Sequence, residues 1–132
     1  MEAIKIVCDT NTISSYVRQD KYFFPEVYET INKIGLQNIY ITPVVYIELQ
    51  RWLSIYKGLT PTERKKIKLF LDSLPVLHLN KSISALSMEI SKKHNQLEPS
   101  DILIGATAVY HNLPVYTLNK KHFKQIENIK LY

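Results

Sequence analysis

Short apolar runs recur along the chain and predict its strands. Residues 4–8 form the first run, which is rich in β-branched side chains and is followed by a polar stretch. Similar runs predict strands at 39–42, 76–79 and 115–117, with a shorter candidate at 129–131. Tight hairpin signals are absent between these runs, so the strands are expected to run parallel.

Segments with helical spacing lie between the strands. Thr42-Pro43 is expected to open a helix that reaches about Tyr56 and ends at Gly58. Thr60, with Glu63 three residues later, has the spacing of a capping box. The predicted helices cover residues 11–17, 25–34, 43–56, 61–73, 82–95, 101–111 and 121–126. This alternation predicts an α/β fold in a single domain over residues 1–132, with a parallel sheet that helices cover on both faces.

Composition narrows the class of protein. Hydrophobic residues make up 45% and charged residues 22% of the 132, which is ordinary for a globular domain. The single cysteine, Cys8, excludes an internal disulfide, and no apolar stretch approaches the ~20 residues of a membrane span. The N-terminus lacks a signal-peptide pattern, so we expect a cytoplasmic protein with no membrane contact. The net charge of +5 is compatible with a nucleic acid or an acidic protein partner.

Three carboxylates and one amide fall where a parallel sheet would place a ligand site. Asp9 ends the first strand and Asn119 follows the fourth, so both are expected at the carboxyl edge of the sheet. Glu48 borders the apolar face of its helix, and Asp101 begins the most apolar helix of the chain. Taken singly, each has a structural interpretation: a helix cap for the aspartates, a surface ion pair for the glutamate and a turn for the asparagine.

Taken together, the carboxylates favour a metal site. Clustered carboxylates without a cation repel one another and raise their pKa values, whereas their oxygens suit a hard divalent cation such as Mg²⁺ or Mn²⁺. Such a cation can activate water for attack on a phosphodiester. The four histidines lack the spacing of a zinc site, and the chain has neither a glycine-rich phosphate loop nor a serine elbow motif.

The motifs resemble those of the PIN-domain ribonucleases. DTN at residues 9–11 follows a short apolar strand and is similar to the opening motif of that family, while VVYIELQ at 44–50 is similar to the second. EPSDILIGATAVYHNLPVYTLNKKHFKQI at 98–126 is similar to the third and fourth motifs. The resemblance spans nearly the whole chain in the family's order. The small size, without added domains, resembles the VapC-like toxins of type II toxin–antitoxin systems.

This resemblance implies a three-layer α/β/α sandwich, a Mg²⁺ or Mn²⁺ site and endonucleolytic cleavage of RNA. It also implies a homodimer and an antitoxin protein that blocks the site. Carried over by position, Asp9, Glu48 and Asp101 would be the catalytic acidic triad that binds the metal. Asn119 would take a fourth catalytic place that is often held by Asp, which leaves one charge fewer for a second metal.

Further residues are expected around this pocket. By the same resemblance, Asn11 and Thr117 match polar positions that line it. Lys120, Lys121, His122 and Lys124 lie beside the fourth catalytic place. They are candidates for binding RNA phosphates, and the alternative is that they form only a solvated helix end.

Aromatic residues are frequent in the N-terminal half of the chain. They include Tyr22, Phe23, Phe24, Tyr28, Trp52 and Tyr56. We expect most of them in the core, and any exposed group of them would suit a dimer or antitoxin contact.

Two other functions stay open on the sequence alone. One is a PIN-like domain that binds RNA or protein without cutting, which an asparagine in the fourth catalytic place would suit. The other is a phosphoacceptor domain, because an aspartate at a strand end can accept a phosphoryl group. The acidic pair that such a domain places before that aspartate is missing here.

Overall fold

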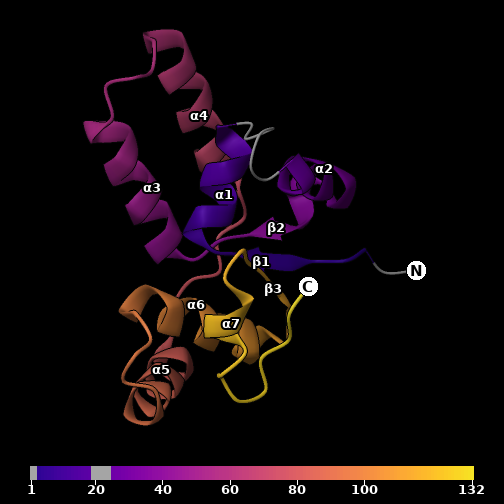
Figure 1. Cartoon of the computed structure of the whole chain (residues 1–132), viewed down its shortest axis with the longest axis vertical. Helices are drawn as coiled ribbons and strands as arrows, with labels where there is room; N and C mark the ends of the chain where they lie inside the picture. Colours follow the sequence, from indigo (N-terminus) through magenta and orange to yellow (C-terminus); the bar gives the residue numbers. More distant parts are fainter. Residues whose placement is uncertain (1–2, 19–24) are drawn as a thin grey trace.

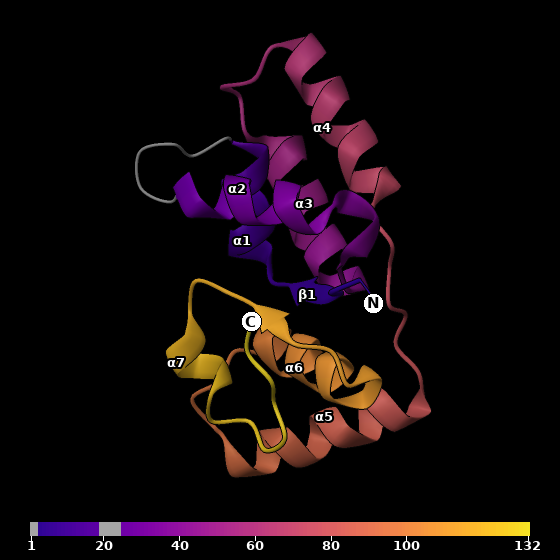
Figure 2. The same cartoon turned by 90° about the vertical axis from the view of Figure 1, so that its right-hand side faces the viewer.

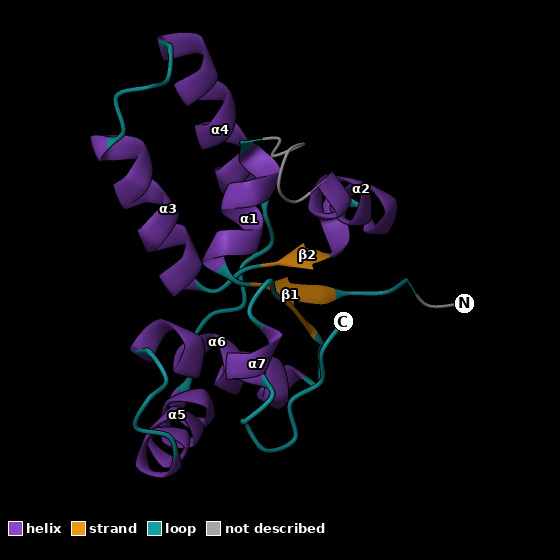
Figure 3. Cartoon of the chain, viewed as in Figure 1, coloured by secondary structure: helices purple, strands orange, loops and turns teal. Residues whose placement is uncertain are grey.

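A parallel sheet of three short strands lies at the centre of the protein (Figure 3). It is seen in a computed structural model that describes residues 3–18 and 25–132. The strands are β1 (Ile6–Cys8), β2 (Ile39–Tyr40) and β3 (Val115–Tyr116). Their order is β2-β1-β3, and Val7 of the central strand pairs with Tyr40 on one side and Val115 on the other. The carboxyl ends of β1 and β3 therefore meet at one edge.

The two remaining predicted strands are reduced to single bridges. Val76 pairs only with Ile41 at one side of the sheet, and Leu131 pairs only with Val115 at the other, both in parallel. The predictions of strands at 76–79 and 129–131 are therefore wrong as strands, although both segments do extend the sheet. Each segment lies at an outer edge of the sheet and pairs on one side only. No strand on its other side holds the backbone extended beyond the bridging residue.

Helices cover both faces of the sheet (Figures 1 and 2). They are α1 (Thr10–Val17), α2 (Pro25–Ile34), α3 (Pro43–Ile55), α4 (Pro61–Ser73), α5 (Lys81–Lys93), α6 (Pro99–His111) and α7 (Lys120–Phe123), with a 3₁₀ turn, η1 (Leu36–Asn38). Helices α1 to α4 lie on one side of β1, and α5 to α7 lie on the other. The predicted three-layer α/β/α arrangement is confirmed. No helix of the described part of the chain is both long and apolar enough to cross a bilayer.

The caps predicted from the sequence explain where several helices begin. The Thr42 hydroxyl accepts the Val45 N–H at the start of α3. Thr60 and Glu63 form both hydrogen bonds of a capping box at the start of α4. Helix α3 ends at Ile55, within one residue of the predicted end near Tyr56. Gly58 is not its cap, because Tyr56 already occupies the C-cap position with an extended backbone.

The core lies on both sides of β1. Its three residues are fully buried, and α6 adds a continuous run of buried residues at 104–108. Gly105 of α6 lets the C-terminal segment approach, since a Cβ there would come within 2.5 Å of Ile126 Cδ1. This close contact holds the segment after α7 against α6, and thereby places α7 beside the carboxyl edge of the sheet.

The aromatic residues of the N-terminal half divide between core and surface. Tyr28 and Trp52 are partly buried, as expected, and Trp52 packs against the core. Tyr56 is 46% exposed and stacks on Trp52 with ring centroids 5.2 Å apart. Residues 22–24 lie outside the described residues.

Candidate acidic pocket

The four residues singled out in the sequence line one pocket. Its volume is about 260 Å³, and it opens at the carboxyl edge of the sheet, where β1 passes into α1 and β3 leads to α7. Its lining residues are Asp9, Thr10, Asn11, Glu48, Glu98, Ser100, Asp101, Asn119 and His122. Segments that are distant in sequence therefore contribute to one hollow.

Asp9 is the most constrained of the acids. It caps α1, so the cap interpretation is correct, yet it also lines the pocket. Its Oδ1 accepts the backbone N–H of Thr12 at 3.0 Å and the Thr12 hydroxyl at 2.6 Å. Its Oδ2 accepts the Thr117 hydroxyl at 2.6 Å. A carboxylate offers about four acceptor sites, so these three bonds leave one, on Oδ2. At 5% exposure, that remaining lone pair has little access to bulk water.

Glu48 approaches from α3. Its Oε1 accepts the Thr10 hydroxyl at 2.6 Å, which ties the second turn of α3 to the first turn of α1. Thr10 is thus a second threonine that positions a carboxylate, and it was not among the predicted residues. Glu48 is exposed, in contrast to Asp9, so the pocket has a buried acidic end and a solvated one.

Asp101 carries the clearest electrostatic signal. It is the third residue of α6, which begins at Pro99, so it does not occupy the cap position predicted as its alternative role. Burial raises the pKa of its carboxyl, and the charges of Asp9, Glu48 and Glu98 raise that pKa further, while His122 opposes the shift. The pocket therefore concentrates negative charge that the chain itself neutralises only in part.

Asn119 and His122 form the remaining wall. Asn119 stands at the cap position of α7, but its side chain makes no capping hydrogen bond. Instead its Nδ2 lies 2.7 Å from His122 Nδ1, and its backbone N–H donates to the Thr117 hydroxyl at 2.9 Å. His122 Nδ1 is also 3.9 Å from Asp101 Oδ2. His122 therefore stands between two of the predicted site residues.

The other predicted residues have different positions. Asn11 lines the pocket, whereas Thr117 lies behind it and contacts it through Asp9. Lys120 and Lys121 line a neighbouring hollow of about 510 Å³ that shares Asn119 with the acidic pocket. Lys124 lines neither hollow. Sequence reasoning placed His122 beside this edge, and it lines the pocket, but it missed four lining or supporting residues: Thr10, Thr12, Glu98 and Ser100.

The donor set fits a divalent cation in its chemistry. Carboxylate and carboxamide oxygens, which Asp9, Glu48, Asp101 and Asn119 supply, are the ligands that Mg²⁺ and Mn²⁺ prefer. The raised pKa of Asp101 reflects burial first and then neighbouring negative charges, which a cation would neutralise. In the spacing that the structure has, no three His, Cys, Asp or Glu side chains of residues 3–18 and 25–132 are arranged to hold one ion. Carboxylates that repel one another are expected to stay apart until a cation joins them.

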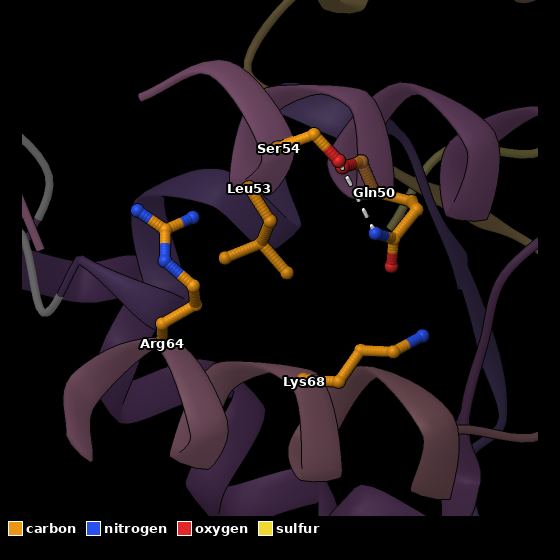
Figure 4. Close-up of a pocket in the computed structure, with 5 residues that line it drawn as sticks. All are labelled: Gln50, Leu53, Ser54, Arg64 and Lys68. Atoms are coloured by element: carbon orange, nitrogen blue, oxygen red, sulfur yellow. Dashed lines mark hydrogen bonds between the residues drawn. The ribbon is translucent and has the colours of Figure 1, made fainter. Parts of the chain in front are cut away.

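A different kind of hollow separates α3 from α4 (Figure 4). It has a volume of about 400 Å³ and is lined by Gln50, Leu53, Ser54, Arg64 and Lys68. Its two cations are already engaged: Arg64 donates to the backbone oxygen of Tyr56 at 2.6 Å, and Lys68 pairs with Asp72 at 3.3 Å. With no carboxylate in its lining, this hollow is not a cation site.

The fold and the acidic pocket together define the class of protein. The protein is a three-layer α/β/α domain whose carboxylates gather beyond the carboxyl ends of parallel strands, where such sheets bind ligands. The family follows from the sequence as a whole: residues 6–129 match the PIN domain, and the chain belongs to that family.

Known proteins resemble the chain over nearly its full length. Ribonuclease VapC1 of Methanocaldococcus jannaschii is 23% identical over 137 residues, which cover 99% of this chain and 89% of that protein. The crystal structure of VapBC2 from Rickettsia felis, bound to a promoter DNA fragment, has a chain with a TM-score of 0.76, 23% identity and 98% coverage of both chains. DNA-bound VapBC from Salmonella typhimurium has a chain with a TM-score of 0.75, 22% identity and coverage of 98% and 97%.

Proposed function

We propose that this PIN domain is a metal-dependent endoribonuclease and the toxin of a toxin–antitoxin pair. The observation that carries the proposal is the meeting of Asp9, Glu48 and Asp101 in one pocket at the carboxyl edge of the sheet. The similarity to a protein named as a ribonuclease supports RNA as the substrate. The likeness to toxin–antitoxin complexes supports an antitoxin protein as the partner.

The three acids would hold Mg²⁺ or Mn²⁺, with Asn119 as a fourth, neutral oxygen ligand. When bound, the cation would lower the pKa of a water and neutralise charge on the phosphate under attack. Asp9 is suited to this task because its hydrogen bonds to Thr12 and Thr117 hold the carboxylate still and leave a single lone pair free. Asp101 lies in the first turn of α6, where the helix dipole favours a negative charge.

The chain's own cations would bind the substrate. Lys120 and Lys121 line the hollow that adjoins the acidic pocket at Asn119, so an RNA strand in that hollow would bring a phosphate to the carboxylates. Lys124 stands one turn further on and would contact the strand outside the hollow. Asn11, exposed at the pocket rim, would bind the substrate by hydrogen bonds.

The experiment is cleavage of RNA by the purified chain with and without a divalent cation. We expect cleavage with Mg²⁺ or Mn²⁺, none with a chelator, and none by Asp9→Asn. The amide keeps the size of the side chain and an acceptor for the α1 cap, but it removes the charge that would hold the cation. Glu89→Gln is the matched control, because Glu89 lies on α5 in an exposed ion pair with Lys92. This variant should cut RNA like the parent.

Cleavage by Asp9→Asn at the parental rate in the presence of a chelator, with contamination excluded, would show the mechanism to be wrong. The second candidate is a domain that binds RNA or protein without cutting it. The neutral Asn119 favours this candidate, as does the lack, among residues 3–18 and 25–132, of three His, Cys, Asp or Glu side chains arranged to hold one ion. If the chain binds RNA but does not cleave it with any divalent cation, the second candidate is the correct one.

A further inference from the structure

The hydrogen bond between Asn119 and His122 has no part in the roles proposed above for the acidic residues. Both side chains line the pocket, and Nδ2 of Asn119 lies 2.7 Å from Nδ1 of His122. Asn119 makes no side-chain cap to α7, so the amide is not oriented by the helix that follows it. His122 is the only partner of this amide group among the described residues.

The direction of this bond decides which atom of Asn119 faces the pocket. An amide nitrogen is a donor only, so Nδ1 of His122 must accept and the ring proton of a neutral imidazole must then sit on Nε2. With the amide nitrogen committed to His122, Oδ1 of Asn119 accepts no hydrogen bond from the described part of the chain. Asn119 therefore keeps its only oxygen acceptor available for a ligand.

We propose that His122 is a positioning residue: its Nδ1 holds the Asn119 amide so that Oδ1, and not the NH₂ group, serves as an oxygen ligand of the pocket. This inference rests on the proposed function for the identity of the ligand, a divalent cation. An aspartate would need no such partner, because both of its terminal atoms are oxygens. An asparagine in the same place presents its oxygen to a cation only when a neighbouring residue fixes which end of the amide group faces the pocket.

The position of His122 supports this role. Its side chain is 45% exposed and stands 3.9 Å from Asp101 Oδ2, beyond a normal hydrogen bond. Nδ1 cannot donate to Asp101 while it accepts from Asn119, so the observed distances select the Asn119 bond. The backbone reinforces it, since the Asn119 N–H is tied to Thr117, whose hydroxyl also binds Asp9. His122, Asn119 and Asp9 are thereby linked through Thr117 in one chain of hydrogen bonds.

The first test needs no metal. Two-bond ¹H–¹⁵N spectra of the imidazole rings, recorded at about pH 8, distinguish the two neutral tautomers from each other and from the protonated ring. The His122 signals are assigned by their loss in His122→Leu. We expect His122 to be almost wholly the Nε2–H tautomer, and we expect the share of the Nδ1–H tautomer to rise in Asn119→Ala. A predominant Nδ1–H tautomer would overturn the proposal, because His122 would then donate to Oδ1 and turn the NH₂ group inward.

The second test measures Mn²⁺ affinity by titration calorimetry. His122→Leu frees the amide to turn and should weaken Mn²⁺ binding by about tenfold, as loss of a residue that orients a ligand does. His122→Asn puts an oxygen acceptor near the place of Nδ1 and should restore most of the affinity. His111→Leu, at the far end of α6, is the control for a histidine outside the pocket and should bind Mn²⁺ like the parent.

The decisive comparison repeats His122→Leu in the Asn119→Asp chain. There the orientation of the side chain no longer matters, so the substitution should not lower Mn²⁺ affinity. An equal loss in both backgrounds would overturn the positioning role, since His122 would then act on the fold or on the cation itself. A parent chain that binds no Mn²⁺ would overturn the proposed function as well. Normal binding and cleavage with no effect of His122→Leu would overturn the positioning role alone.

Discussion

Thr117→Val probes the buried support of the pocket. Thr117 is 2% exposed, and its hydroxyl both donates to Asp9 Oδ2 at 2.6 Å and accepts the Asn119 N–H at 2.9 Å. Valine has the same shape but neither function, so Asp9 loses a donor where water has little access, and a backbone N–H loses its acceptor.

The cost follows from these two bonds. A hydrogen bond to a charged group contributes about 1.5–3 kcal/mol and a neutral one about 1 kcal/mol. The added methyl group returns about 0.8 kcal/mol when buried. The free energy of unfolding should therefore fall by about 2–3 kcal/mol, which lowers Tm by about 6–15 °C for a chain of this size.

Thermal melts in metal-free buffer, followed by circular dichroism, measure the effect. Thr107→Val is the matched control: Thr107 is equally buried, but its hydroxyl only donates to the Leu103 carbonyl within α6. Its removal should cost less than about 1 kcal/mol. RNA cleavage by Thr117→Val should also fall about 10–100-fold, because Asp9 is no longer held in place. Equal melting temperatures for the two variants would refute the role of Thr117 as the support of Asp9.

The same charges and surfaces lead to three further predictions. The folded-state pKa of Asp101 is raised from its usual 3.8, so the folded chain binds more protons than the unfolded one between the two pKa values. The contribution of Asp101 to stability is therefore complete below that pH window and is lost as the pH rises through it. Asp101→Asn should flatten this fall in the free energy of unfolding, as measured by urea titrations in metal-free buffer. An unchanged pH slope in the variant would contradict the prediction. Asn119→Asp should keep or raise Mg²⁺-dependent cleavage, since it adds a ligand charge, and a cleavage assay with a slower variant would count against Asn119 as a ligand. A second copy should cover apolar helix surface such as Ile47 and Ile55 of α3, which are 63% and 67% exposed; light scattering that finds only monomer at micromolar concentrations would exclude the dimer but not the nuclease.

Local signals in the sequence were enough to place most helices. The bounds of α2 and α4 agree with the predicted ranges 25–34 and 61–73, because a proline or a capping box acts within one turn of its own helix. The end of α3 agrees with the predicted end near Tyr56 to within one residue, but Gly58 is not the stop signal, because Tyr56 already has an extended backbone. The edge segments were missed because a bridge such as Val76 to Ile41 depends on a partner far along the chain.

In the pocket, residue types were predictable and their partners were not. Thr12 is an exception that the sequence could have revealed, since it follows the capping aspartate by three residues and reaches it at the usual cap spacing. The bond from Thr10 to Glu48 joins residues 38 apart, and no local pattern indicates it. The partner of Asn119 is only three residues away, but the choice between a turn, a cap and His122 depends on how α7 packs.

The hydrogen bond between Thr117 and Asp9 spans 108 residues, and this separation has a consequence for synthesis. While the ribosome is still making the chain, Asp9 has emerged long before β3 and Asn119 exist, so the pocket has only part of its wall. The carboxylate cannot be held in its final orientation until the β3 segment has left the exit tunnel and paired with β1. No nascent chain that lacks β3 can therefore hold Asp9 in its final orientation, and the pocket is completed only after the residues on both sides of this 108-residue separation have been made.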